Sequence, residues 1–217
     1  MTAGGAAAVM DHPHMNSVKQ LGMGLVGLII VEEATSGASS DFDLNPDTVL
    51  PEGRKLRPAG VLAGFVACEQ GLELVLTMRS SRLKHHPGQI AFPGGKVDPG
   101  DQDEVAAALR EAREEVGLSE SRVDVLGTLP PHETVTGFQV TPVIGLVMHD
   151  FDPIPEPGEV AEVFRVPFEH VADLERYSIQ GRRWRGATRH YWTVPFGPYY
   201  IWGATARMLR GLAERMA

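Results

Sequence analysis

The sequence predicts a mixed α/β fold in which a β-sheet is layered with helices. Apolar runs of strand length are interleaved with two segments of helical periodicity, which is the pattern of such layered folds. The 217 residues are 43% hydrophobic and 22% charged, values that are typical of globular proteins and exclude a disordered or fibrous chain. This length allows one domain with an extension.

The strands are expected in short apolar runs bounded by turn residues. The first two runs, 59–68 and 72–78, are separated by Glu69, Gln70 and Gly71, which predicts a β-hairpin. Four further runs predict strands at 123–126, 140–148, 162–166 and 190–194.

Two helices are expected, at residues 103–116 and 203–216. The first is followed by Gly117, a residue that favours the left-handed conformation in which helices commonly end. Asp101 stands three residues before Glu104, a spacing that predicts a cap at the start of this helix.

Residues 1–40 are expected to form an N-terminal extension, partly mobile, and residues 41–217 the folded domain. Residues 1–17 are rich in alanine and glycine, and residues 34–40 are small and polar, which favours a tail and a linker. Residues 21–31 are apolar, but this stretch is too short to span a bilayer. The acidic Glu32 and Glu33 follow it where a signal peptide would have small residues.

Charge and cysteine content narrow the classes of function. The net charge of −8 disfavours a general nucleic-acid binder, which would carry a basic surplus. A single cysteine, Cys68, excludes an internal disulfide and a cysteine-based zinc site. The default location is a reducing cytoplasm. The one basic cluster is predicted to be an exposed loop, and it consists of Arg182, Arg183, Arg185 and Arg189.

Three glutamates of the first helix are the main candidates for chemistry. At about 100° per residue, Glu111, Glu114 and Glu115 fall within about a 100° arc beside an apolar stripe. Carboxylates that repel one another in this way are the oxygen ligands that Mg²⁺ or Mn²⁺ prefers. Taken alone, the three residues also fit a solvated acidic face.

The segment before this helix strengthens the metal interpretation. Residues 92–101 read Phe-Pro-Gly-Gly-Lys-Val-Asp-Pro-Gly-Asp. Its glycines are typical of a turn in which the backbone approaches another group closely or adopts a positive φ. A glycine-rich turn leading into a helix of carboxylates predicts a platform for phosphate and metal.

With this pattern the sequence resembles the Nudix hydrolase family. The residues that match the family's motif are Gly95, Arg110, Glu111, Ala112, Glu114, Glu115, Gly117 and Leu118. The resemblance implies an α/β/α sandwich with a mixed β-sheet and a catalytic loop–helix–loop. It also implies metal-dependent hydrolysis of a nucleoside diphosphate derivative. The sequence departs from the motif at its first acid, which is Asp101 and stands one residue farther from Arg110 than the motif requires.

The same expansion by one residue is similar to the coenzyme A diphosphatase branch of the family, and an upstream motif matches it as well. Lys84 stands where that motif has an arginine. Segments 136–146, 159–167 and 201–209 also look like this branch. The resemblance implies cleavage of coenzyme A or acyl-CoA to (acyl-)4′-phosphopantetheine and adenosine 3′,5′-bisphosphate. It assigns substrate binding to Arg79, Ser80, Lys84, Gly88, Phe92, Gly94 and Gly95.

Under this resemblance Glu111, Glu114 and Glu115 are the expected ligands of Mg²⁺ or Mn²⁺. The expected catalytic residues are Arg110, Glu114, Glu115, Glu133 and Glu159. Arg110 is expected to orient the carboxylates. The general base is one of the helix glutamates or a distal acid, for which Glu133, Glu159 and Glu162 are candidates, although loop acids are usually exposed and solvated.

Two alternatives remain open at this stage. One is hydrolysis of another nucleotide derivative, such as ADP-ribose, NADH or an oxidised nucleotide, and the segment from Arg79 to Gly88 discriminates between the two enzymes. The other is a non-catalytic nucleotide-sensing module, which would not need three mutually repelling glutamates. The expected partner is a small CoA-like nucleotide, with no nucleic acid, no membrane, and a monomeric or homodimeric state.

Overall fold

The computed structural model describes residues 38–48, 53–84, 86–184 and 186–217, and only the backbone of Trp184. The apolar stretch at 21–31, the predicted tail at 1–17 and Arg185 lie outside the described residues. Among those described, no helix is both long enough and apolar enough to cross a membrane.

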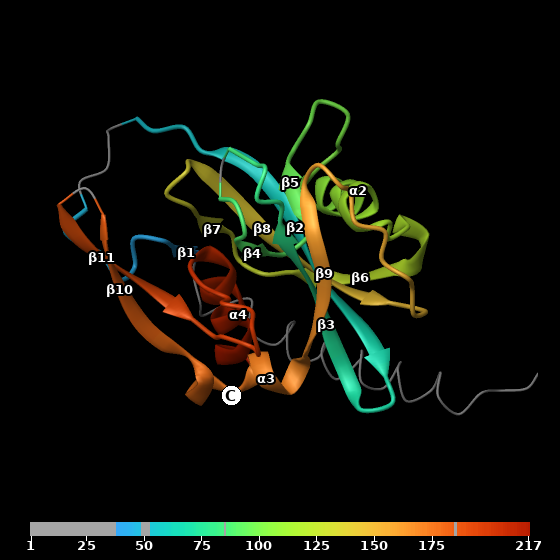
Figure 1. Cartoon of the computed structure of the whole chain (residues 1–217). Helices are drawn as coiled ribbons and strands as arrows, with labels where there is room; N and C mark the ends of the chain where they lie inside the picture. The colour runs from blue at the N-terminus through green and yellow to red at the C-terminus, as the bar shows by residue number, and fades with distance from the viewer. Residues whose placement is uncertain (1–37, 49–52, 85, 185) are drawn as a thin grey trace, which may run out of the picture.

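A mixed β-sheet lies between helices on its two faces, which confirms the predicted α/β/α sandwich (Figure 1). Helix α2 (Glu104–Val116) packs on one face, and helices α3 (Phe168–Ala172) and α4 (Ala204–Glu214) pack on the other. The main path of the sheet runs in the order β1 (Ser39–Ser40), β7 (His132–Glu133), β8 (Phe138–Val147), β2 (Arg57–Cys68), β3 (Gly71–Arg79) and β4 (Ile90–Ala91).

Three further strands join this path at its centre. Strand β5 (Gly94–Lys96) pairs with β2, β6 (Val123–Thr128) pairs with β8, and β9 (Val160–Pro167) pairs with β3. Strands β2 and β8 pair in parallel, whereas β2 and β3 form the antiparallel hairpin that the sequence predicts. Two 3₁₀ turns, Glu120–Arg122 and Leu174–Arg176, lie outside the strands.

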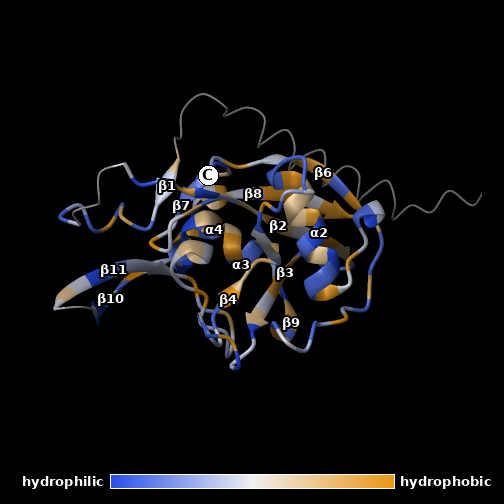
Figure 2. Ribbon diagram, turned by 90° about the horizontal axis from the view of Figure 1, so that it is seen from above, coloured by the Kyte–Doolittle hydropathy of each residue, from blue (hydrophilic) through white to orange (hydrophobic). Residues whose placement is uncertain are grey.

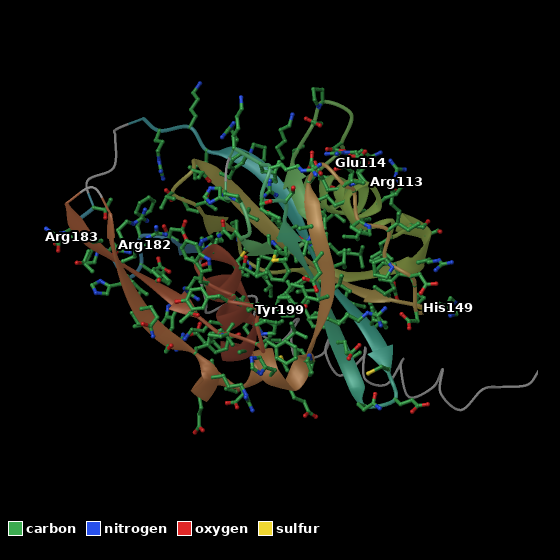
Figure 3. The ribbon with its side chains drawn as sticks, viewed as in Figure 1. Arg113, Glu114, His149, Arg182, Arg183 and Tyr199 are labelled. Atoms are coloured by element: carbon green, nitrogen blue, oxygen red, sulfur yellow. The ribbon has the colours of Figure 1, made fainter. Side chains whose placement is uncertain are left out.

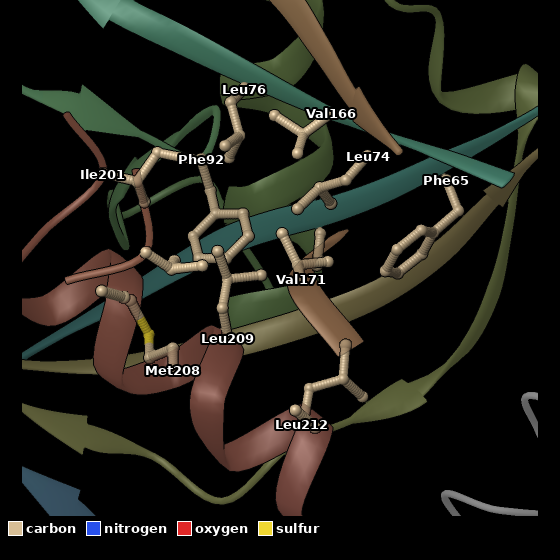
Figure 4. Close-up of a cluster of buried hydrophobic side chains, with 14 of the residues drawn as sticks. Phe65, Leu74, Leu76, Phe92, Val166, Val171, Ile201, Met208, Leu209 and Leu212 are labelled. Carbon is tan, nitrogen blue, oxygen red and sulfur yellow. The ribbon is translucent and has the colours of Figure 1, made fainter. Parts of the chain in front are cut away.

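The central strand β2 is apolar on both sides because helices cover both faces of the sheet. Leu62 and Val66 pack in the cluster beneath α2, while Phe65 packs in the cluster beneath α3 and α4. Figure 4 shows this second cluster, in which Leu209 and Leu212 of α4 approach side chains of the sheet. Helix α2 therefore packs against a sheet whose other face is covered by α3 and α4.

Helix α2 begins and ends at capping residues. The Asp103 carboxylate accepts a hydrogen bond from the Ala106 N–H at 2.8 Å, and Gly117 ends the helix with φ of 72°. This confirms the prediction that the helix ends at Gly117. The prediction that Asp101 caps the helix is wrong, because Asp103 stands nearer and Asp101 bonds to Arg110 instead.

Two segments predicted as loop or linker are strands. Ser39–Ser40, predicted as the end of a linker, forms β1 and pairs in parallel with β7. The arginine cluster forms part of a separate antiparallel hairpin, β10 (Ser178–Trp184) and β11 (Ala187–Thr193), which turns at Gly186 with φ of 87°. The arginine-rich sequence lacks the apolar alternation that signals a strand. In both Figure 1 and Figure 2 this hairpin projects on the side of the molecule away from α2.

Candidate active site

The most deeply buried carboxylate of α2 is that of Glu115, which is 5% exposed. Its Oε2 accepts a hydrogen bond from the Gly94 N–H at 3.1 Å, so the backbone of the glycine turn fixes the orientation of this side chain. The pKa of Glu115 is raised to about 7, mainly by burial and to a lesser extent by the charge of Glu111, while the hydrogen bond from the Gly94 N–H lowers it. This group is therefore poised between its two protonation states near neutral pH.

Glu111 lies beside Glu115, and its carboxylate is next to Gly95 of the glycine turn. Burial raises its pKa, and Arg110 partly counteracts the effect. A Cβ at Gly95 would overlap the Glu111 carboxylate, so a larger residue at this position would have to displace that carboxylate. Glu114 is the most exposed of the three, with 52% of its side chain accessible.

Arg110 ties the helix carboxylates to the preceding loop. Its Nε and Nη2 donate to the two carboxylate oxygens of Asp101 at 2.9 and 3.0 Å, a bidentate pair. Its Nη1 donates to Glu111 at 3.0 Å and to Glu114 at 3.1 Å. These hydrogen bonds lower the pKa of Asp101, and they connect Asp101 through Arg110 to two of the α2 carboxylates. Asp101 thus orients the loop through Arg110.

Glu159 and Arg79 lie close enough to this cluster for their charges to shift its pKa values. The charge of Glu159 raises the pKa of Glu111 and Glu115, and the charge of Arg79 lowers that of Glu115. Pairing of β3 with β9 brings the two together: Arg79 lies opposite Val160, and the Ser80 N–H donates to the Glu159 carbonyl at 2.7 Å. Residues far apart in the sequence therefore meet at one end of the sheet.

The other two candidate distal acids have different surroundings. Glu133 lies in β7 and forms an ion pair with Arg54, and it is not among the charges that shift the pKa of Glu111 or Glu115. Glu162 accepts a hydrogen bond from the Tyr199 hydroxyl at 2.6 Å. Glu159 is thus the distal candidate that interacts electrostatically with α2.

The predicted substrate-binding residues fall into two groups. Ser80 and Phe92 are buried, at 6% and 4% exposure, and the Phe92 ring belongs to the core shown in Figure 4. Gly88 has φ of 70°, and its N–H donates to the Arg79 carbonyl at 3.0 Å. This bond shapes the loop that carries the exposed Lys84. Arg79 and Lys84 therefore remain the side chains of this set that can meet an anion.

The donor set fits a hard divalent cation in its chemistry, because it offers carboxylate oxygens whose negative charge Arg110 only partly balances. Among the described residues, however, no group of three or more His, Cys, Asp or Glu side chains is gathered closely enough to hold a metal ion. The Arg110 guanidinium forms ion pairs with both Glu111 and Glu114.

Comparison with known proteins gives a consistent family. The NUDIX domain model matches residues 58–185. Nudix hydrolase NudL of Enterobacter sp. (strain 638) is 42% identical, and the match covers 79% of this chain and 94% of that protein. NudL of Citrobacter koseri is 46% identical over 80% of this chain and 90% of its own length. A solved Nudix hydrolase from M. smegmatis, RenU, is 26% identical, covers 55% of this chain and 74% of its own, and has a TM-score of 0.46.

The matched region contains the whole glycine turn and helix α2, so the carboxylate cluster lies inside the shared domain. Both the family model and the NudL relatives agree with the motif read from the sequence. The chain belongs to the Nudix hydrolase family, enzymes that act on the diphosphate linkage of nucleoside diphosphate derivatives.

Proposed function

We propose that this Nudix hydrolase cleaves the diphosphate linkage of coenzyme A or acyl-CoA, with (acyl-)4′-phosphopantetheine and adenosine 3′,5′-bisphosphate as products. The observation that carries the proposal is the placement of Arg79 close enough to α2 to shift the pKa of Glu115. Arg79 begins the segment that resembles the coenzyme A branch, and a cation beside the carboxylates suits a substrate with an additional phosphate.

Nudix hydrolases generally use divalent metal ions such as Mg²⁺. We assign the holding of Mg²⁺ or Mn²⁺ to Glu111, Glu114 and Glu115. A bound ion would neutralise charge on the diphosphate oxygens and make water a better nucleophile.

The side chains of the chain would then act as follows. The charge of Glu159 raises the pKa of Glu111 and Glu115, so Glu159 is our first choice to accept the proton of the attacking water, with Glu133 second. Arg110 keeps Glu111 and Glu114 aligned, and Gly94 and Gly95 let the diphosphate approach the turn. Arg79 and Lys84 would bind the 3′-phosphate. Lys84 has an ammonium group where the motif has a guanidinium, so it would contribute positive charge but not two parallel hydrogen bonds to a phosphate.

We also propose that residues 41–217, together with strand β1 at Ser39–Ser40, act as one hydrolase domain in the cytoplasm, and that the residues before β1 are an extension. The resemblance to the coenzyme A branch spans nearly all of that range, which supports a single domain.

A substrate panel with Mg²⁺ and Mn²⁺, with the products identified by mass, tests the proposal. We expect coenzyme A or an acyl-CoA to be cleaved in preference to ADP-ribose, NADH and oxidised nucleotides. Arg79→Gln is expected to raise KM for coenzyme A more than KM for dephospho-coenzyme A, because only the former carries the 3′-phosphate. Turnover of ADP-ribose or NADH with coenzyme A left intact would contradict the proposed specificity.

A further inference from the structure

The hairpin β10–β11 has a charge opposite to that of the rest of the protein. Residues 178–193 contain four arginines and no acidic residue, although the chain as a whole carries a net charge of −8. Figure 3 shows Arg182 and Arg183 on one side of the molecule, and Arg113 and Glu114 of α2 on the other. Charges in water are screened over about 8 Å at physiological salt, so the acidic α2 site has little effect on an anion at the hairpin.

Two of these arginines lie directly opposite one another. Arg182 of β10 pairs with Arg189 of β11, and like charges in this position destabilise a sheet. In the described part of the chain neither forms an ion pair with an acid. The Arg189 guanidinium lies 5.9 Å from the centre of the Phe42 ring, and Arg182 is exposed. Two guanidinium groups held together without a carboxylate are suited to bind phosphate.

Aromatic side chains continue the same face. Tyr191 stands two residues after Arg189 and is therefore on the same side of the hairpin. Trp202 packs edge-on against Tyr191, with ring centres 5.0 Å apart. The Tyr200 hydroxyl lies 3.5 Å from that of Tyr191, and Tyr200 is 46% exposed. Arginines followed by accessible aromatic rings are the combination by which proteins bind both the phosphates and the bases of an unpaired strand.

The shape of this face favours an extended ligand. Gln180, Arg182 and Ala187 are exposed along the hairpin, so the face is an open ribbon, whereas small molecules are usually bound in concave sites. An oligonucleotide laid along this ribbon would add contacts over its length.

We propose that the face formed by Gln180, Arg182, Arg189, Tyr191 and Tyr200 binds single-stranded nucleic acid. The arginine pair contacts successive phosphates, and the tyrosines stack with unpaired bases. This binding is separate from hydrolysis at α2. The net charge of the whole chain disfavours nucleic-acid binding, but this sum does not show that the arginines are concentrated in one hairpin.

Fluorescence anisotropy of the full chain with a labelled 12-nucleotide single strand tests the proposal. EDTA is present, so that no metal-dependent hydrolysis occurs and the result does not depend on the substrate of α2. We expect affinity to fall with salt, with a slope of about −0.7 per phosphate contacted. Arg182→Gln with Arg189→Gln should weaken binding at least tenfold and reduce this slope by about 1.4. Tyr200→Ala should weaken binding about tenfold.

A charge-matched double variant provides the control. Arg113→Gln with Arg122→Gln removes the same charge on the α2 side and should leave the affinity unchanged. Removing the like-charged pair should not unfold the hairpin, which a melting curve checks, and Arg182→Lys with Arg189→Lys should give intermediate affinity. The proposal is wrong if the Gln variant binds like the wild type, if a duplex of the same sequence binds equally well, or if polyglutamate displaces the strand as effectively as unlabelled oligonucleotide.

Discussion

Helices α2 and α4 cover opposite faces of one sheet but are stabilised differently. The buried residues of α4 include Met208, Leu209 and Leu212, and its first residue follows Gly203 without a side-chain cap. The buried residues of α2 are three alanines, Val116 and the ionisable Glu115. Large apolar side chains contribute more to stability than alanines do, so α4 anchors the fold.

Helix α2 buries little apolar surface and is stabilised instead by its close approach to β2 and by its capping residues. It packs so near to β2 that a Cβ at Gly60 would overlap the Glu104 carbonyl, and Asp103 and Gly117 satisfy its two ends. The buried Glu115 reduces stability in the metal-free protein, because burial disfavours the charged form. The helix that carries the candidate site is therefore the less stabilising of the two.

The largest expected effect is on turnover. Glu114→Gln and Glu115→Gln should each lower kcat by about 10²- to 10⁴-fold, since each removes a carboxylate charge from the site. Circular dichroism should show an unchanged fold. The control is Glu104→Gln in the first turn of α2, which should retain most of the activity. Near-normal turnover in both site variants would exclude the proposed metal site.

The next effect is on stability and concerns α4. Leu209 is 1% exposed, so Leu209→Ala should lower the free energy of unfolding by about 2–5 kcal/mol. Leu109→Ala on the partly buried side of α2 should cost less. Urea denaturation of both variants measures the difference, and an equal loss would contradict the assignment of α4 as the anchor.

Glu115→Gln should stabilise the metal-free protein. The pKa of Glu115 is raised to about 7 in the folded state, so the folded protein binds more protons than the unfolded chain between pH 4.5 and 7. Stability therefore falls as pH rises through this window and is constant above it. At pH 8 in EDTA the variant should gain up to about 3.5 kcal/mol, since the pKa is raised from 4.5 to about 7 and one pKa unit corresponds to about 1.4 kcal/mol. Its stability between pH 5 and 8 should vary less than that of the wild type, and parallel profiles for the two proteins would refute the prediction.

The smallest effect is expected at the start of α2. Asp103→Ala removes the cap and should cost about 1 kcal/mol in thermal or urea unfolding. Asp101→Asn should instead reduce activity, because it weakens the bidentate contact that orients Arg110. If Asp103→Ala reduced activity more than Asp101→Asn did, these two roles would have to be exchanged.

The sequence predicted the elements whose signals are local. The hairpin β2–β3 and helix α2 follow from short-range periodicity and from Gly71 and Gly117. The three helix glutamates were identified for the same reason, since one helix carries them all. Strands β1, β4 and β7 contain two residues each, which is too short for any periodic pattern.

The rest of the site depends on contacts between distant parts of the chain. Nothing near Glu159 in the sequence distinguishes it from Glu133. The pairing of β9 with β3 and the hydrogen bond from the Glu156 N–H to the Glu115 carbonyl bring it toward α2. The cap of α2 was misassigned because Asp101 and Asp103 both precede the helix, and the contact of Asp101 with Arg110 decides between them. Of the hairpin β10–β11, the sequence predicts only the end of β11, through the apolar run 190–194, because the arginines in the rest of the hairpin hide the alternation of a strand.

The parallel pairing of β2 with β8 has a consequence for the order of folding during synthesis. It joins Arg57 to Phe138 and Val66 to Val147, so β2 emerges from the ribosome long before its central neighbour. Until then, the hairpin β2–β3 and helix α2 can form only a half-covered layer. Distant pairings of this kind slow folding and leave apolar strands exposed to aggregation in the interval. A nascent chain arrested before residue 138 should therefore be a stronger client of chaperones than one arrested after residue 147.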